Sequence, residues 1–185
     1  YSVGQLHRYA VKLYKSLEKE TGKKVGFSVV SNIRLAQTKD RMDEYHQYAG
    51  VAKTIGVNVK FLKPEQVKEI WPLCNIKGLV GAIQHPEDGY IQPADLTQAL
   101  ATGARNHGAE IYRNTTVVGI KQTKDGWTVE TDKGAISCEH VVSCSGNFAR
   151  QTGHMVGLEV PVIPVEHQFI VTEPHPEIQK RKKEG

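Results

Sequence analysis

The sequence has 185 residues, 39% of them hydrophobic and 24% charged, with a formal net charge of +4. This composition is typical of a folded globular chain and argues against disorder or a coiled coil, and no apolar run approaches the length of about 20 residues that a membrane helix needs. The basic run Lys180-Arg181-Lys182-Lys183 is interpreted as a solvated tail rather than a nucleic-acid site.

Helical spacing of apolar residues and strong turn signals organise the first part of the chain. Proline favours the first turn of a helix, and the residue before proline disfavours helical angles, so Pro64 and Trp71-Pro72 bound a short helix. The predicted elements are a helix over 3–20, strands over 25–30 and 33–38 joined as a hairpin at Ser31-Asn32, a helix over 41–54 capped by Asp40, a strand over 57–62, and a helix from Pro64 to Trp71.

The second part alternates a long helix with short strands. The predicted elements are a broken strand over 76–83, a helix over 93–107 begun by Pro93, strands over 109–112, 117–123, 127–131, 135–138 and 140–144, a helix over 148–156, and a strand over 162–172. The helix over 93–107 with the strand after it resembles half of a β-α-β unit, whereas 117–138 reads as an antiparallel meander. The chain is therefore predicted to be α/β with a mixed sheet, or α+β mixed.

A run of small residues after the strand at 140–144 is the first candidate for a ligand site. Ser145 and Gly146 would let backbone N–H groups approach a bound anion at the start of a helix. An ordinary tight turn explains the same pattern equally well. No GxGxxG or GxxxxGK[ST] occurs in the sequence, so any nucleotide site within these residues is incomplete.

The remaining reactive residue types give weaker patterns. The eight histidines show no metal-ligand spacing and the three cysteines no CxxC pair, so no metal site is predicted. Ser143 and Ser145 lack a GxSxG setting, and Cys144 is interpreted as a buried, inert thiol. Alternation along 162–172 puts His167 and Phe169 on one face, where they could line a pocket for a small amine; a structural histidine is the alternative.

The segments over 85–100, 108–111, 116–120 and 141–149 resemble, in order and spacing, the central part of the D-amino-acid oxidase superfamily. The strand Pro164-Val-Glu-His-Gln-Phe-Ile-Val-Thr looks similar to one of the dimethylglycine and sarcosine dehydrogenases. The resemblance implies an internal fragment of an FAD-dependent oxidoreductase in which a Rossmann-like FAD domain is interleaved with an antiparallel-sheet substrate domain.

The resemblance also implies roles for parts of this chain. Segments 1–22 and 85–158, the latter including the meander, would belong to the FAD-binding lobe, and 23–84 and 159–185 to the substrate lobe. The implied FAD-binding residues are Val117, Ser145, Gly146 and Phe148. His167 is the catalytic candidate because a histidine can titrate near neutral pH. A histidine that carries covalent flavin would precede Tyr1, and a folate-binding domain would follow Gly185.

The implied activity is oxidation of a secondary or tertiary N-methyl amino acid, dimethylglycine or sarcosine, by hydride transfer to FAD. The alternatives are a glycine or sarcosine oxidase that uses oxygen, and a non-catalytic binding fragment. An electron acceptor is an expected partner, and the compartment is expected to be cytoplasmic in a bacterium or the mitochondrial matrix in a eukaryote. Because the phosphate-binding loop would lie outside this sequence, these residues alone are expected to retain FAD weakly or not at all.

Overall fold

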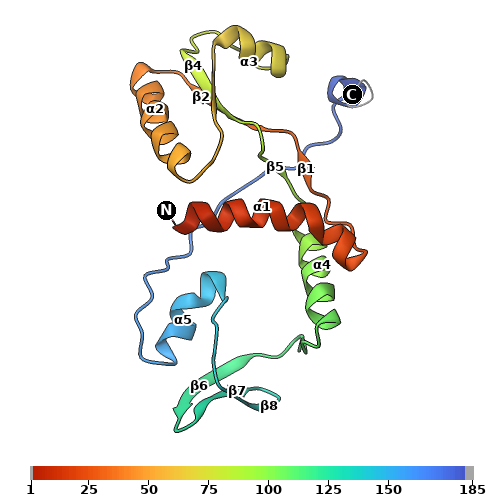
Figure 1. The fold of residues 1–185 in the computed structure, drawn as a ribbon, viewed down its shortest axis with the longest axis vertical. Helices are drawn as coiled ribbons and strands as arrows, with labels where there is room; N and C mark the ends of the chain where they lie inside the picture. The colour runs from red at the N-terminus through yellow and green to blue at the C-terminus, as the bar shows by residue number, and fades with distance from the viewer. Residues whose placement is uncertain (1, 182–185) are drawn as a thin grey trace. The chain divides into compact units, whose positions relative to one another are not determined.

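The computed structural model describes residues 2–181, so the predicted tail residues Lys182 and Lys183 lie outside the described part of the chain. The chain divides into two compact units, Tyr1–Ile111 and Tyr112–Gly185 (Figure 1). Each unit has its own strands and helices. The assignment of segments to an FAD lobe and a substrate lobe stays a prediction.

The first unit is built around a three-stranded antiparallel sheet in the order β2-β4-β3, made of β2 (Asn32–Ala36), β4 (Gly81–His85) and β3 (Lys60–Leu62). Helices α2 (Lys39–Thr54) and α3 (Pro64–Ile70) both contact it, as Figure 1 shows. Leu62, Val67, Cys74 and Ala82 form a buried cluster between α3 and the sheet. β4 is the central strand, and four of its five residues are buried.

A second cluster lies where two helices meet. The C-terminal half of α1 (Ser2–Thr21) packs against α4 (Pro93–Asn106), with Leu17, Val25 and Ala99 buried between them (Figure 1). A Cβ built on Gly103 would lie 3.3 Å from the Thr21 methyl group, so small side chains on α4 allow the close approach. The two-residue strands β1 (Ser28–Val29) and β5 (Gly89–Tyr90) pair beside this cluster.

The predicted hairpin between 25–30 and 33–38 is wrong. β1 pairs with β5 and β2 pairs with β4, so the two strands enter different sheets. The backbone N–H groups of Val30 and Ser31 both donate to the carbonyl of Asp88. The N–H groups at the predicted hairpin turn are therefore satisfied by a residue far away in the sequence. Ser31 adopts φ +66° at this point.

The helices of the first unit follow the sequence prediction to within a few residues, but the predicted cap of α2 is wrong. Thr38 rather than Asp40 caps this helix, since the Thr38 hydroxyl accepts a 3.2 Å hydrogen bond from the Arg41 N–H. Asp40 lies in the first turn instead, where a negative charge still favours the helix dipole.

The second unit contains the predicted antiparallel meander, made of β6 (Val117–Thr123), β7 (Gly126–Thr131) and β8 (Gly134–Cys138). Ile120 is its most deeply buried residue, with 7% of its surface exposed. After it come a 3₁₀ turn, η1 (Gly146–Phe148), and two short helices, α5 (Ala149–His154) and α6 (Pro176–Arg181). The meander prediction is confirmed.

Three predicted strands, over 109–112, 140–144 and 162–172, are absent from the structure. A strand persists when a neighbouring strand satisfies its backbone N–H and C=O groups, and none of the described strands pairs with these segments. Their apolar side chains are accordingly open to solvent, with Val142 82% and Phe169 84% exposed. Cys144 is exposed as well, so its prediction as a buried thiol is wrong.

The loss of the strand over 109–112 also removes the predicted half of a β-α-β unit, and every strand pair among the described residues is antiparallel. The prediction of a chain that combines helices and sheets is confirmed, but the predicted mixed sheet is wrong, because the described sheets are antiparallel throughout. Across residues 2–181, no helix combines the length and apolar character that crossing a membrane requires. The same residues hold no cluster of histidine, cysteine and carboxylate side chains suited to a metal ion.

Candidate functional site

Three of the predicted cofactor residues lie in a single turn of the second unit. Ser145 precedes η1, Gly146 opens it and Phe148 closes it. Gly146 has φ +54°, a left-handed conformation that disfavours any residue with a Cβ. The hydroxyls of Ser143 and Ser145 are 2.8 Å apart, and the Phe148 side chain is 68% exposed. The turn therefore presents small polar groups and one open aromatic ring.

The fourth predicted residue, Val117, begins β6, which is an edge strand of the meander. Its pairing with Thr131 is followed by a register irregularity before Gly119. An edge strand leaves some backbone N–H and C=O groups pointing away from the sheet. Val117 is thus placed where its backbone can meet a ligand.

His167 does not lie on a strand. It belongs to the long stretch between α5 and α6 that has no regular structure, and its side chain is exposed. The predicted face shared by His167 and Phe169 is consequently not formed by the described residues. A catalytic role for His167 stays a prediction.

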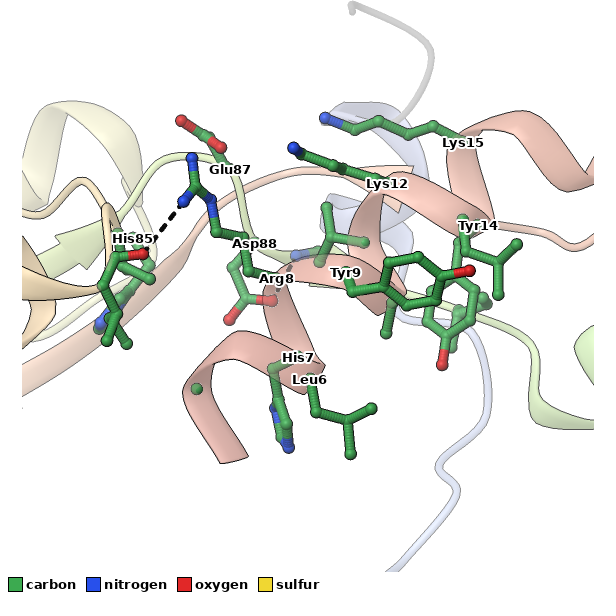
Figure 2. Close-up of a pocket in the computed structure, with 18 of the residues that line it drawn as sticks. Leu6, His7, Arg8, Tyr9, Lys12, Tyr14, Lys15, His85, Glu87 and Asp88 are labelled. Carbon is green, nitrogen blue, oxygen red and sulfur yellow. Dashed lines mark hydrogen bonds between the residues drawn. The ribbon is translucent and has the colours of Figure 1, made fainter. Parts of the chain in front are cut away.

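The first unit contains a groove that none of these residues lines. It has a volume of about 900 Å³ and runs between the N-terminal part of α1, the end of α2 and the segment from His85 to Ile91. In Figure 2, the Arg8 side chain extends from α1 toward the segment that carries His85 and Glu87. The Arg8 Nη1 donates a 3.2 Å hydrogen bond to the carbonyl of Ile55.

A buried histidine and a partly exposed tyrosine of the groove are hydrogen-bonded to each other. His85 is 8% exposed, and its Nε2 and the Tyr48 hydroxyl are joined by a 3.1 Å hydrogen bond. The His85 Nδ1 is buried with no hydrogen-bond partner among the described residues. Burial lowers the pKa of His85, the nearby charge of Arg34 lowers it further, and Asp88 opposes both. The imidazole is therefore neutral near pH 7.

This lowered pKa predicts how the first unit responds to acid. The unfolded chain binds a proton at His85 more readily than the folded chain does, so the stabilising effect of the neutral imidazole is complete above about pH 6.5 and is lost progressively below it. We expect the free energy of unfolding to fall as the pH is lowered from about 7.5 to about 5.5, and to fall less in His85→Gln. Urea unfolding at the two pH values measures both slopes, and equal slopes would contradict the burial of a neutral His85.

Basic side chains outnumber acidic ones along the groove. Four arginine and lysine side chains face two carboxylates, and the lining residues concerned are Arg8, Lys12, Lys15, Arg34, Glu87 and Asp88. Both carboxylates already accept hydrogen bonds, Glu87 from the Asn58 amide at 3.0 Å and Asp88 from the Gly89 N–H at 2.8 Å. Within residues 2–181 none of the four cations forms an ion pair.

Comparison with known proteins decides the family. The family model described as "DAO: FAD dependent oxidoreductase" matches residues 1–184. The chain belongs to the DAO family of FAD-dependent oxidoreductases. It is 39% identical to the mitochondrial dimethylglycine dehydrogenase of Rattus norvegicus over 97% of its own length and 21% of that protein. It is also 36% identical to the mitochondrial pyruvate dehydrogenase phosphatase regulatory subunit of Mus musculus, over 92% of this chain and 20% of that protein.

The DAO fold is shown by solved structures too. The crystal structure of glycine oxidase from Geobacillus kaustophilus superposes with a TM-score of 0.70 at 31% identity, covering 84% of this chain and 41% of that one. The chain thus spans about a fifth of the length of the curated relatives named above and less than half of this structure.

The open surface of the second unit is compatible with the FAD contacts predicted from the sequence, which stay a prediction. A Cβ built on Gly146 would meet no atom within 4 Å, so the space beside this turn is open. Val117 and Phe148 are 38% and 68% exposed, and open apolar side chains beside an edge strand and a small-residue turn suit an aromatic ring system. These four residues would hold part of the cofactor, while the groove of the first unit is a separate feature.

Sequence reasoning missed the groove because its residues come from segments that are far apart in the sequence. Helical spacing alone places Tyr48 among the apolar residues of its helix, and Arg8 and Arg34 are isolated cations that belong to no sequence motif. The signal that could have revealed it is the position of His85 at the end of a buried, apolar strand. An ionisable side chain in such a place needs a hydrogen-bond partner. Tyr48 supplies that partner from 37 residues away in the sequence.

Proposed function

We propose that the protein carrying this chain oxidises a small N-methylated amino acid, dimethylglycine or sarcosine, with FAD as the cofactor. The supporting observation is the 39% identity to a dimethylglycine dehydrogenase over nearly the whole chain. The match of residues 1–184 to a family of FAD-dependent oxidoreductases supports the same reaction class. If the source is a eukaryote, the mitochondrial location of that relative supports a mitochondrial location for this protein.

FAD, when bound, supplies the acceptor for a hydride from the N-methyl carbon, so the substrate loses two electrons and becomes an iminium. Within this chain, the Ser145–Phe148 turn and Val117 would contribute to holding the cofactor. We further propose that 1–22 and 85–158 belong to the FAD lobe and that 23–84 and 159–185 belong to the substrate lobe. The packing of α1 against α4 supports the first of these pairings.

His167 would take its place beside the substrate only when its segment gains a partner strand. A histidine can accept or donate a proton near neutral pH, which supports a role in orienting or deprotonating the amine. We propose this role for His167, together with folate and an electron acceptor as partners of the full-length protein. A covalent link from FAD to a histidine outside this chain belongs to the same proposal.

Two other functions have specific support. Structural likeness to a glycine oxidase favours an enzyme that passes electrons to oxygen. Similarity to a phosphatase regulatory subunit favours a protein that uses the same fold for binding rather than turnover. Both share the fold and differ from the leading proposal in what reoxidises the cofactor or in whether turnover occurs.

Steady-state turnover of the full-length protein separates the three functions. We expect oxidation of dimethylglycine or sarcosine with an artificial electron acceptor, and turnover at least about tenfold slower with oxygen alone. A tenfold rate difference corresponds to about 1.4 kcal/mol in activation free energy. Faster turnover with oxygen would favour the oxidase. No turnover of dimethylglycine, sarcosine or glycine with either acceptor would contradict the enzymatic proposals and favour the binding function.

A further inference from the structure

The groove of the first unit has the features of a ligand site that is separate from the predicted cofactor residues. Its volume of about 900 Å³ lies within the range of small-molecule pockets. Its lining combines aromatic side chains, among them Tyr9, Tyr14, Phe27 and Tyr90, with the charged residues described above. Such a mixture of apolar surface and a few polar groups is typical of sites that bind small organic molecules.

The charged side chains of the groove favour an anionic ligand. Glu87 and Asp88 are both engaged by hydrogen bonds from within the chain, whereas Arg8 and Arg34 have no carboxylate partner among residues 2–181. A guanidinium binds a carboxylate through paired N–H donors. Arg8 uses Nη1 for the carbonyl of Ile55, and its other nitrogens stay available for an anion.

The backbone at Gly56 leaves room for the Arg8 guanidinium. A Cβ on Gly56 would lie 2.8 Å from the Arg8 Nη1, closer than a real Cβ contact allows. Gly56 also adopts φ +69°, which favours glycine. The end of α2 is thus shaped to admit the guanidinium at the rim of the groove.

The pair formed by His85 and Tyr48 supplies a neutral donor. A neutral imidazole carries one N–H and one lone pair. If Nε2 bears the hydrogen and donates to the Tyr48 oxygen, the Tyr48 O–H is left to donate to a ligand. Tyr48 is 38% exposed and lines the groove, so a ligand oxygen can reach it, while the buried His85 holds the ring in place.

We propose that this groove binds a small organic acid, with the ligand carboxylate held by Arg8 and Arg34 and by the hydroxyl of Tyr48. The aromatic side chains receive the apolar part of the ligand. The carboxylate can come from an amino acid of the kind proposed as substrate or from an unrelated organic acid. Both present the same group to the two guanidiniums.

Isothermal titration calorimetry of the purified protein tests this site with benzoate as the probe. Benzamide serves as the neutral analogue and benzylamine as the cationic one, and dimethylglycine is added as a competitor. We expect benzoate to bind at least about tenfold more tightly than benzamide or benzylamine, a difference of about 1.4 kcal/mol. Displacement of benzoate by dimethylglycine would identify an amino-acid ligand, and failure to displace it would identify an unrelated acid; both outcomes support the site.

Variants locate the binding. Arg8→Gln and Arg34→Gln are each expected to weaken benzoate binding about tenfold, and Tyr48→Phe about threefold. Arg34→Lys keeps the charge and should retain more affinity than Arg34→Gln. Lys39→Gln removes the same charge from α2 outside the groove and should change the affinity by less than about twofold. Urea midpoints confirm that each variant is folded.

Two outcomes would overturn the proposal. One is benzoate binding no tighter than that of benzamide. The other is a loss of affinity in Lys39→Gln equal to that in Arg8→Gln and Arg34→Gln, because it would indicate a general charge effect. Neither result depends on turnover, so failure of this site and failure of the proposed enzymatic function are distinguishable.

Discussion

Replacing Gly89 by alanine is expected to destabilise the first unit by about 3 kcal/mol. A Cβ at this position would lie 1.9 Å from the carbonyl oxygen of Ser28 and 3.0 Å from the Cα of Val29. Both are backbone atoms of β1, so the strand itself must move. Because β1 and β5 pair through only two residues each, a shift of this size breaks the bridge.

Urea unfolding followed by far-UV circular dichroism measures the effect of Gly89→Ala. Gly50→Ala is the matched control, because Gly50 lies inside α2 and a Cβ there meets nothing within 4 Å. Alanine is a better helix former than glycine, so this control should gain about 0.5 to 1 kcal/mol. Similar midpoints for the two variants would contradict the close approach of β1 and β5.

Ile83→Ala is expected to cost about 4 kcal/mol, the second large effect. Ile83 is fully buried on β4, the central strand, and it pairs with Arg34 of β2 and Phe61 of β3. Removing three carbons from this position takes apolar surface out of the core and leaves a cavity that a strand held on both sides cannot collapse to fill.

Val51→Ala is the control for Ile83→Ala, since Val51 lies on α2 with 60% of its surface exposed. It should change the free energy of unfolding by less than about 0.5 kcal/mol. Hydrogen exchange followed peptide by peptide adds a local readout. Faster exchange in β2, β3 and β4 is expected for Ile83→Ala, and a loss below about 1 kcal/mol would mean that Ile83 is not held in a packed core.

The sequence specified those elements whose signals are local. The helices began and ended close to their predicted bounds because apolar spacing, prolines and glycines act within a few residues. The meander followed for the same reason, since tight turns at Gly126 and Gly134 connect neighbouring strands. Resemblance to the DAO family supplied the cofactor and the reaction class, which local patterns alone left open.

Features that depend on distant partners were not predictable. Strand-like runs over 109–112 and 162–172 have the right composition, yet no described strand satisfies their backbone. Val30 and Ser31 bond to Asp88 rather than to a local hairpin partner. The groove also depends on distant partners, because Arg8, Tyr48 and His85 line it together only once the sheet, α2 and α1 are assembled.

The cofactor residues illustrate the boundary between the two kinds of feature. Ser145, Gly146 and Phe148 share one turn because they are adjacent in sequence, and the positive φ of Gly146 explains the glycine in physical terms. Val117 comes from the meander, a separate element. Their joint role in binding FAD is a proposal that rests on the family and on open space beside the turn.

Anaerobic spectroscopy of the full-length protein tests the central claim most directly. The oxidised protein should show flavin absorbance at about 450 nm. Addition of dimethylglycine or sarcosine should reduce the flavin, so that this absorbance is lost within a single turnover. Bleaching by either amine, with none on addition of benzylamine, is the predicted result. A protein that carries no flavin, or whose flavin stays oxidised with all of these amines, would contradict the proposed function.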